Sequence, residues 1–327
     1  DIGDIYSVTF AETHSSDVYT FTATATPTSG TPVDITSEIT SWSMKLFYMN
    51  ADTGASWSTN SANLSSYSAG TYIMKITVVY SGVTYSGEVS ITKSIAYLGS
   101  KAPDETLAVD DIVFNDGSAE PYTNTLTLTS DQINGAIAYI VYVGTDCSDD
   151  SSSRIIGAGL APQNTAMPWC TSSAGAYNKN ISEIRLNRQN YTGKKDGSNI
   201  LTKISEYLDS NGISNDTDTA ANYPAFYYAI NYKNQAQSHV SGSAYESGWY
   251  LPSGMELDKV YQKKTNLSAV MTMCGTELLN RGYLAANLYD GIGANNKTVV
   301  TIYFNTYTND SYETCTTGSR VLPVRQF

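Results

Sequence analysis

A strongly specified helix start in the second half of the chain constrains the fold more than any other stretch. The segment Gly248–Leu257 reads GWYLPSGMEL. Ser253 is followed three residues later by Glu256, which is the spacing of a capping box at a helix N-terminus. Three apolar residues then recur at helical spacing, namely Leu257, Val260 and Tyr261. We therefore predict a short amphipathic helix over Met255–Lys263, entered through two rigid aromatic side chains.

The composition favours an exported, β-rich protein. The chain has 327 residues, enough for two domains, and 41% of them are hydrophobic while only 15% are charged. Uncharged polar side chains must therefore cover most of the surface. Tyr is abundant, with 26 residues against 7 Phe, and Thr and Tyr suit the half-buried faces of sheets. We expect an extracellular or cell-surface location.

The net charge argues against two classes of partner. The charge is −12 at pH 7, whereas binding to nucleic-acid phosphates needs clustered Lys and Arg. The same negative charge disfavours adsorption to anionic lipid. No apolar run approaches the length of a membrane span. We expect contact with a membrane only through a lipid anchor lost upstream of Asp1.

Residues 1–95 predict an all-β domain. Trp42 is expected in its core, and Tyr72 resembles the corner tyrosine whose hydroxyl bonds back to the backbone in immunoglobulin-like sandwiches. Trp57 lies in a loop-like Gly-Ala-Ser-Trp-Ser sequence, where both core packing and sugar stacking stay open. Four segments alternate apolar and polar residues with period two, which predicts an immunoglobulin-like β-sandwich: Val18–Ala25, Ile39–Met49, Tyr72–Tyr80 and Val83–Ile91.

A second domain is predicted over residues 108–327, after a linker at 96–107 that lacks periodicity. Strands are expected at Asp110–Phe114, Ala136–Val143 and Val299–Phe304, and Arg320–Val324 is expected to close the sheet. Besides the helix described first, helical patterns cover Ser198–Asn211 and Thr219–Tyr232, and a brief turn is expected at Thr129–Asn134. Mixed helices and short strands indicate an α+β domain.

The motifs of this second domain occur in a characteristic order. An Asp-Ile-Val-Phe-Asn-Asp-Gly-Ser opening precedes the WYLPS helix start, Cys-Gly-Thr-Glu-Leu-Leu follows it, and the chain ends on RVLPVRQF. This order, over roughly Val109–Phe327, resembles the Lcl C-terminal domain of bacterial surface and fimbrial proteins. The resemblance implies a C-type-lectin-like fold, related to that of the formylglycine-generating enzyme. Where the family usually has Tyr-Trp-Ser-Ser-Ser, this chain has Tyr-Leu-Ala-Ala-Asn at 283–287, so the family's ligand chemistry is not carried over there.

The candidate ligand-binding surface lies late in the chain. Tyr supplies rigid contact area and Asn supplies adaptable hydrogen bonds, and the resemblance implies binding through the last loops and strands. The candidate residues are Tyr283, Asn287, Tyr289, Asp290, Tyr303, Asn305, Tyr307, Asn309 and Tyr312. The expected partner is a host or bacterial surface protein or a glycan. The alternatives are an ordinary Tyr-rich exported surface and, by the resemblance, a diversified variable surface.

The chain offers no clear catalytic constellation. Its two histidines, His14 and His239, lie in loop-like settings without a nucleophile motif. Glu246, Glu256 and Glu277 show no spacing that selects a glycosidase pair. We expect a non-enzymatic binding protein. The alternative is a structural, pilus-type subunit that assembles with itself, and a carbohydrate-active enzyme is the least favoured reading.

Cysteines and acidic loops raise two further expectations. None of Cys147, Cys170, Cys274 and Cys315 lies in a Cys-x-x-Cys motif. We favour the disulfides Cys147–Cys170 and Cys274–Cys315, because each pair brackets a loop-rich segment, with four buried free thiols as the alternative. The loops at 146–150 and 215–218 are rich in oxygen ligands but lack EF-hand spacing. No cofactor is expected; calcium stays open, with solvated loops as its alternative.

Overall fold

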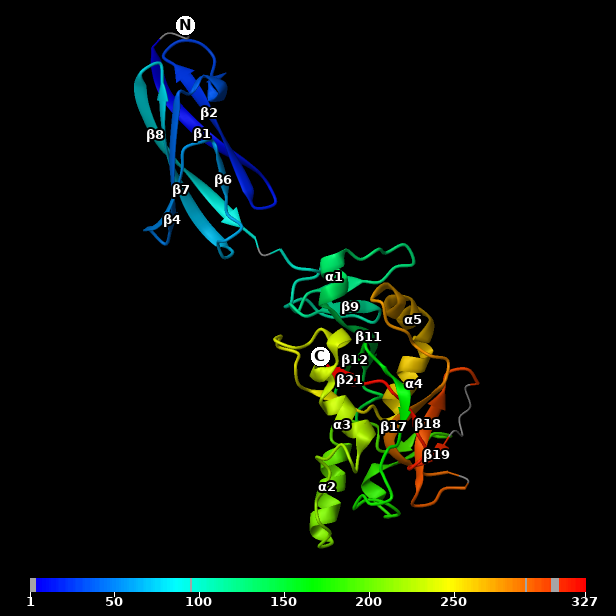
Figure 1. The fold of residues 1–327 in the computed structure, drawn as a ribbon. Helices are drawn as coiled ribbons and strands as arrows, with labels where there is room; N and C mark the ends of the chain where they lie inside the picture. The colour runs from blue at the N-terminus through cyan, green and yellow to red at the C-terminus, as the bar shows by residue number, and fades with distance from the viewer. Residues whose placement is uncertain (1–3, 95, 292, 307–311) are drawn as a thin grey trace. The chain divides into compact units, whose positions relative to one another are not determined.

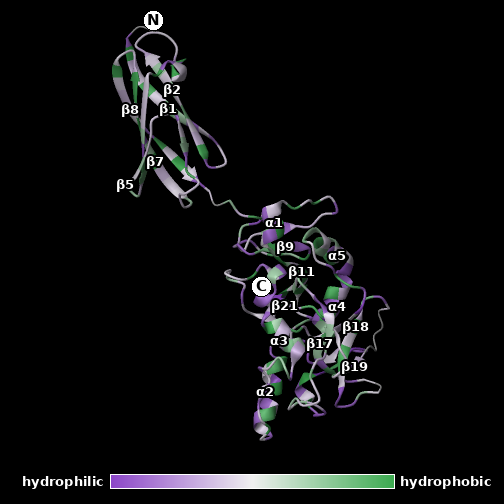
Figure 2. Ribbon diagram, in the orientation of Figure 1, coloured by the Kyte–Doolittle hydropathy of each residue, from purple (hydrophilic) through white to green (hydrophobic). Residues whose placement is uncertain are grey.

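The computed structural model describes residues 4–94, 96–291, 293–306 and 312–327. These residues belong to two compact units, Asp1–Ala96 and Tyr97–Phe327 (Figure 1). Figure 2 shows hydrophobic and hydrophilic residues interspersed along the strands of the first unit, as the period-two pattern requires. No helix in the described part of the chain is both long and apolar enough to cross a membrane.

The first unit is built from strands, which confirms the all-β prediction. Its two sheets have the orders β1-β2-β3, with β6 also paired to β2, and β5-β4-β7-β8. A 3-10 turn, η1, covers Thr36–Glu38. The strands are β1 Ile5–Ser15, β2 Val18–Pro27, β3 Val33–Asp34, β4 Ser41–Tyr48, β5 Ala51–Trp57, β6 Ser61–Asn63, β7 Gly70–Tyr80 and β8 Val83–Lys93.

The core of this unit lies between the two sheets. The hydroxyl of Tyr72 donates to the carbonyl of Ser68 at 2.7 Å, as predicted for a corner tyrosine. Trp42 is half-buried and meets Phe10 edge to face, with ring centroids 6.5 Å apart. Trp57 ends a strand rather than lying in a loop, and it packs on the same core. The deepest core residues include Tyr19, Phe21, Met44, Leu46, Met74 and Ile76.

The segment predicted as a linker is part of the second unit from residue 97 onward. The N–H of Gly99 donates to the hydroxyl of Ser118 at 2.8 Å. Lys101 forms an isolated antiparallel bridge with Ala119. The Gly and Pro residues of 96–107 therefore mark irregular backbone, but not a free connector.

The second unit combines helices with two sheets. One sheet has the order β10-β9-β11-β12-β21-β16, and the other has the order β13-β20-β17-β14-β15, with β18 paired to β17 and to β19. The strands are β9 Asp111–Phe114, β10 Ala119–Pro121, β11 Ala136–Gly144, β12 Arg154–Gly159, β13 Gln163–Met167, β14 Arg185–Asn187, β15 Thr192–Gly193, β16 Trp249–Tyr250, β17 Gly282–Tyr289, β18 Thr298–Tyr303, β19 Tyr312–Thr314, β20 Ser319–Val321 and β21 Val324–Gln326.

The helices of this unit agree with the sequence where local signals are strong. The predicted capping box begins α4, whereas α3 begins only at Pro224, because proline suits the first turn but not a helix interior. The turn expected at Thr129–Asn134 is a short helix. The helices are α1 Ser130–Gly135, α2 Ile200–Ser210, α3 Pro224–Ile230, α4 Gly254–Gln262 and α5 Lys264–Met273, with 3-10 turns η2 Ser182–Ile184, η3 Tyr232–Asn234 and η4 Ala236–Ser238.

The end of the chain joins the two sheets. The predicted closing strand, Arg320–Val324, is split at Leu322-Pro323 into β20 and β21, which belong to different sheets. Proline cannot donate a ladder hydrogen bond, so the pairing is interrupted there. The last strand, β21, lies between β12 and β16, and this places Arg325 opposite Trp249.

Candidate functional site

The tyrosines predicted to form a binding face on β17 are core residues. Every residue of β17 is buried, and Tyr283, Asn287 and Tyr289 are each 0% exposed. The strand is central in its sheet, and residues of two core clusters cover its two faces. Alternation between the faces cannot expose a side chain when both faces are covered. The predicted contact role is therefore wrong for these three residues.

Asn287 instead holds together three segments of the core. Its Oδ1 accepts from the N–H of Gly254 at 2.8 Å. Its Nδ2 donates to the carbonyls of Ile184 and Lys194, at 3.1 and 2.9 Å. The side chain thus ties β17 to the start of α4 and to the segments on either side of the β14–β15 hairpin, which is a structural role.

Four of the remaining candidates lie at or near the surface, and the other two lie outside the described residues. Asp290, Asn305 and Tyr312 are exposed, and Tyr303 is half-buried with its hydroxyl bonded to the carboxylate of Glu313. Tyr312 also stacks on the buried ring of Tyr289, with centroids 4.6 Å apart. Two further candidates, Tyr307 and Asn309, lie outside the described residues. The exposed members therefore lie beside β17, on β19 and next to β18, rather than on β17 itself.

The start of α4 carries a buried ion cluster. Glu256 Oε2 accepts from the N–H of Ser253 at 2.8 Å, completing the predicted capping box. Glu256 Oε1 accepts from Arg154 Nη1 and from the hydroxyl of Tyr250, both at 2.8 Å. Arg154 is 3% exposed and Glu256 is 0% exposed. The helix start recognised from the sequence is thus also an anchor for β12.

Arg154 also contacts residues outside α4, so the cluster connects several segments of the core. Its Nη1 lies 2.8 Å from Asp196 Oδ1 and donates to the carbonyl of Cys147 at 2.6 Å. Its Nε donates to the side-chain carbonyl of Gln326 at 3.0 Å. The cluster therefore joins β12, β21, α4 and the loop before α2. Because its groups bond to one another inside the protein, we interpret it as structural.

The burial of Glu256 has a measurable consequence for stability. Burial raises its pKa from 4.5 to about 7, with Arg154 opposing the rise. The folded protein therefore keeps this proton to a higher pH than the unfolded chain does. The stability that it contributes is fully present below about pH 4.5 and is lost as pH rises to about 7, by up to about 3 kcal/mol.

We expect the difference in unfolding free energy between wild type and Glu256→Gln to change accordingly. The variant has no proton to lose, so the wild type's advantage should shrink between about pH 5 and about pH 8. Urea denaturation at several pH values measures this difference. An advantage that grows with pH over this range would contradict the shift.

Two sequence motifs from distant parts of the second unit meet at one pocket. The pairing of β16 with β21 brings Trp249-Tyr250-Leu251 beside Arg325-Gln326. A pocket of about 290 Å³ lies there, next to the start of α2 and the end of α3. We call it the aromatic pocket; it is lined by Gly197, Ser198, Leu201, Phe226, Ile230, Gly248–Leu251, Arg325 and Gln326.

The lining of the aromatic pocket is mainly apolar. Phe226 and Trp249 are almost fully buried and form its inner wall, whereas Ile230 is 40% exposed at the end of α3. Ser198 and Gln326 are exposed, so polar groups lie at its mouth. Apolar walls with a few polar groups are typical of sites that bind small ligands or single side chains.

Arg325 is the cationic member of this lining. Its Nε donates to the carbonyl of Ser247 at 2.9 Å, and its Nη1 donates to that of Gln326 at 3.0 Å. The guanidinium lies 4.9 Å from the Tyr245 ring centroid and 5.1 Å from that of Phe327. Burial lowers its pKa, and no carboxylate of the described residues pairs with it. The cation is therefore available to an anionic ligand.

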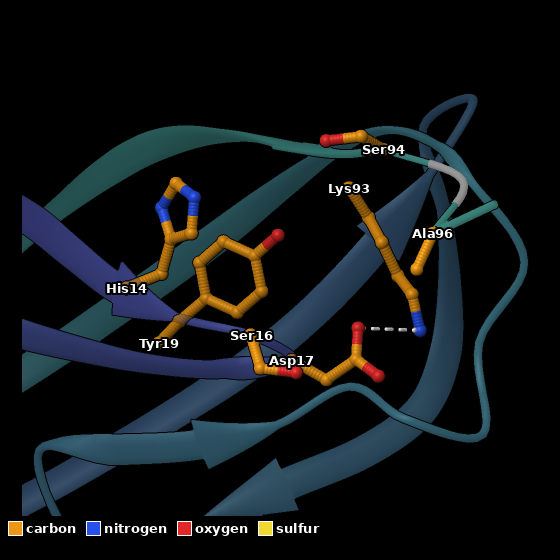
Figure 3. A pocket seen from close by; sticks show the side chains of 7 residues that line it. All are labelled: His14, Ser16, Asp17, Tyr19, Lys93, Ser94 and Ala96. Atoms are coloured by element: carbon orange, nitrogen blue, oxygen red, sulfur yellow. Dashed lines mark ion pairs between the residues drawn. The ribbon is translucent and has the colours of Figure 1, made fainter. Parts of the chain in front are cut away.

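A smaller hollow in the first unit is lined by side chains that contact one another (Figure 3). It measures about 210 Å³ and lies between the β1–β2 turn and the end of β8. Lys93 pairs with Asp17 at 3.1 Å and donates to the carbonyl of Leu64 at 2.5 Å. The ring of His14 lies 4.9 Å from that of Tyr19. These contacts favour a role in closing the end of the sandwich.

The acidic loops considered for calcium use their carboxylates within the protein. Asp146 pairs with Lys259 at 2.8 Å, and Asp149 pairs with Lys194. Asp216 accepts from the N–H of Gly175 at 3.0 Å. Over the residues that the structure describes, no group of three or more His, Cys, Asp or Glu side chains could hold a metal ion. Calcium stays the open alternative to the expectation of no cofactor.

The structure corrects the predicted cysteine pairing. The four cysteines are buried and free. Neither predicted pair lies together: Cys147 and Cys274 belong to one core cluster, and Cys170 and Cys315 belong to another. The prediction paired cysteines that bracket loop-rich segments of the sequence. It was wrong because the pairing of β13 with β20, which are far apart in the sequence, brings Cys170 close to Cys315 instead.

Comparisons with known proteins assign no family. No family model matches the chain, and no curated protein or solved structure matches it.

Proposed function

We propose that this protein is an exported, non-enzymatic binding protein of the cell surface, adhesin-like, whose second unit recognises a protein or glycan ligand. In this proposal the second unit has a C-type-lectin-like fold and the first is an immunoglobulin-like spacer. One observation carries it: the WYLPS segment and the C-terminal VRQF segment, the two most specific motifs, line the same pocket.

The fold assignments draw on separate support. The two sheets of the first unit and the hydrogen bond from Tyr72 to Ser68 favour the immunoglobulin-like reading. The mixture of helices and short strands favours the lectin-like reading of the second unit, as does the order of its motifs. In this proposal the ligand binds at the aromatic pocket. The exposed Asp290, Asn305 and Tyr312 form a separate, less enclosed surface that is not the proposed site.

The chemistry of the aromatic pocket favours a ligand that presents an apolar group beside an anionic one. Its apolar walls can cover a hydrocarbon or aromatic group, which gains free energy by leaving water. Arg325 can donate charge-assisted hydrogen bonds to a carboxylate or sulfate. Acidic protein segments and acidic glycans both offer this combination.

The test compares two aspartate substitutions on the same helix. Ile230→Asp puts a carboxylate at the aromatic pocket, where it opposes an anionic ligand and competes for Arg325. Tyr227→Asp is the matched control, because Tyr227 is 37% exposed against 40% for Ile230 but does not line the pocket. We expect the affinity of Ile230→Asp for the ligand to be weaker by about tenfold or more. The affinity of Tyr227→Asp should equal that of the wild type.

Affinity would be measured on arrays of glycans and of surface proteins, with and without calcium. Hits would then be titrated with wild type and both variants. Equal loss in both variants, or none in either, would contradict the assignment to this pocket. Product formation on the glycan array would contradict the non-enzymatic proposal, and absence of binding on both arrays would contradict the binding function.

One observation also favours the alternative of self-assembly. Strands β1 and β8 have 11 residues each and lie at the edges of their sheets. Long edge strands can pair with another chain, although the charged Glu12 and Glu88 oppose this. Sedimentation over a wide concentration range tests it: growing polymers support a pilus-type subunit, and a constant monomer contradicts one.

A further inference from the structure

Two cysteines that are far apart in the chain lie together in the second unit. Cys170 follows β13, and Cys315 lies between β19 and β20. The antiparallel pairing of β13 with β20 brings these segments together, with Met167 opposite Ser319. Beyond that pair, the N–H of Cys170 donates to the carbonyl of Cys315 at 3.1 Å. The two residues are thus neighbours across paired backbones.

The surrounding backbone fixes both cysteines. The N–H of Cys315 donates to the carbonyl of Lys297 at 2.6 Å, and the N–H of Thr171 donates to that of Asn222 at 2.9 Å. Trp169, which is 1% exposed, donates its indole N–H to the carbonyl of Ala286 at 3.0 Å. The backbone around both cysteines is therefore held in place, and both side chains belong to the same core cluster.

The two thiols interact unequally. A hydrogen bond between them raises the pKa of Cys170, where burial acts in the same direction. The same bond lowers the pKa of Cys315, and Lys297 contributes to the lowering. Each thiol is thus close enough to the other to change its pKa, as two sulfurs that can bond must be.

We propose that Cys170 and Cys315 form a disulfide bond in the exported protein. The thiolate of one of the two cysteines attacks one sulfur of an external disulfide, such as glutathione disulfide, and expels one thiolate, which takes up a proton. The other cysteine then loses its proton and attacks the sulfur of the first, expelling the second external thiolate, which also takes up a proton. Two protein thiols are oxidised and one external disulfide is reduced to two thiols. Because both residues are almost fully buried, the exchange occurs while the domain folds.

The other two cysteines are internal controls. Burial raises the pKa of the Cys147 thiol, with Glu256 acting in the same direction. Burial alone raises that of Cys274 to about 11. Both lie in the other core cluster, and both are expected to remain thiols.

The experiment refolds the whole chain with a mixture of oxidised and reduced glutathione. Iodoacetamide added in denaturant then labels the free thiols, and the digest is mapped by mass spectrometry without reduction. We expect label on Cys147 and Cys274 and a cross-linked peptide pair containing Cys170 and Cys315. Label on all four cysteines, or a cross-link between any other pair, would overturn the proposal. Since the oxidant is supplied, this outcome does not depend on the proposed export or ligand.

Thermal unfolding gives a second readout. A disulfide that closes a long loop restricts the unfolded chain, so oxidised wild type should unfold about 10 °C above the reduced protein. Cys147→Ser/Cys274→Ser should keep this difference, and Cys170→Ser should lose it. If Cys170→Ser fails to fold, the wild-type peptide map and the difference in melting temperature between oxidised and reduced wild type still test the proposal. Equal melting of the two wild-type forms would count against the bond.

Discussion

At about pH 8, where Glu256 is ionised in the wild type, Arg154→Met is expected to lower the unfolding free energy of the second unit by about 3–5 kcal/mol, because it removes the cation that faces this buried carboxylate. Arg154 is 3% exposed, and its Nη1 lies 2.8 Å from both Glu256 Oε1 and Asp196 Oδ1. Methionine is apolar and fills part of the same volume, so lost packing contributes little. Urea denaturation followed by circular dichroism measures the change.

Two further variants separate this effect from a general loss of charge. Lys203→Met breaks an exposed pair with Glu206 on α2, and such surface pairs contribute at most about 1 kcal/mol. Arg154→Met/Glu256→Met replaces the buried pair as a whole. It should cost less than Arg154→Met alone, because the buried carboxylate is removed with its cation and the carboxylate left unpaired is that of the partly exposed Asp196. A double variant that is less stable by the sum of the single effects would show that the pair is not coupled.

Tyr283→Ala is expected to destabilise the second unit by about 3–5 kcal/mol, the range for truncating a large core aromatic. Tyr283 is 0% exposed, and its ring centroid lies 4.6 Å from that of Phe304. Tyr283→Phe keeps this packing and should cost less than about 1 kcal/mol. Asn305→Ala, at an exposed neighbour of β18, should stay within about 0.5 kcal/mol of wild type.

Thermal and urea unfolding of these three variants distinguish a core tyrosine from a contact residue. A Tyr283→Ala protein that unfolds like wild type but no longer binds a ligand of the wild type would restore the surface role predicted from the sequence. A clear loss of stability in Tyr283→Ala alone fits the burial of β17.

Local signals in the sequence predicted the elements best. The capping box of Ser253 and Glu256 needs only neighbours in the chain, and period-two alternation identified the core face of β2. Alternation cannot show whether the second face of a strand is also covered. On β17 the run Leu284-Ala285-Ala286 is nearly continuous in small and apolar residues, which is typical of a strand buried on both faces. From that signal, Tyr283 could have been predicted as a core residue.

Sites built from distant segments could not be predicted in the same way. Trp249 and Arg325 each belong to a recognised motif, but only the pairing of β16 with β21 places them at one pocket. Nothing near Arg154 in the sequence indicates that its partner is Glu256. The neighbouring cysteines 170 and 315 likewise depend on the pairing of β13 with β20.

Hydrogen exchange with the tightest-binding array ligand tests the central claim most directly, because it maps the contact without any substitution. The aromatic pocket as the binding site predicts slower exchange on ligand addition in peptides covering 197–201, 226–230, 248–251 and 325–327. Peptides covering 303–306 and 312–314 should exchange as in the free protein. Protection confined to the latter peptides, with none around the pocket, would contradict the account.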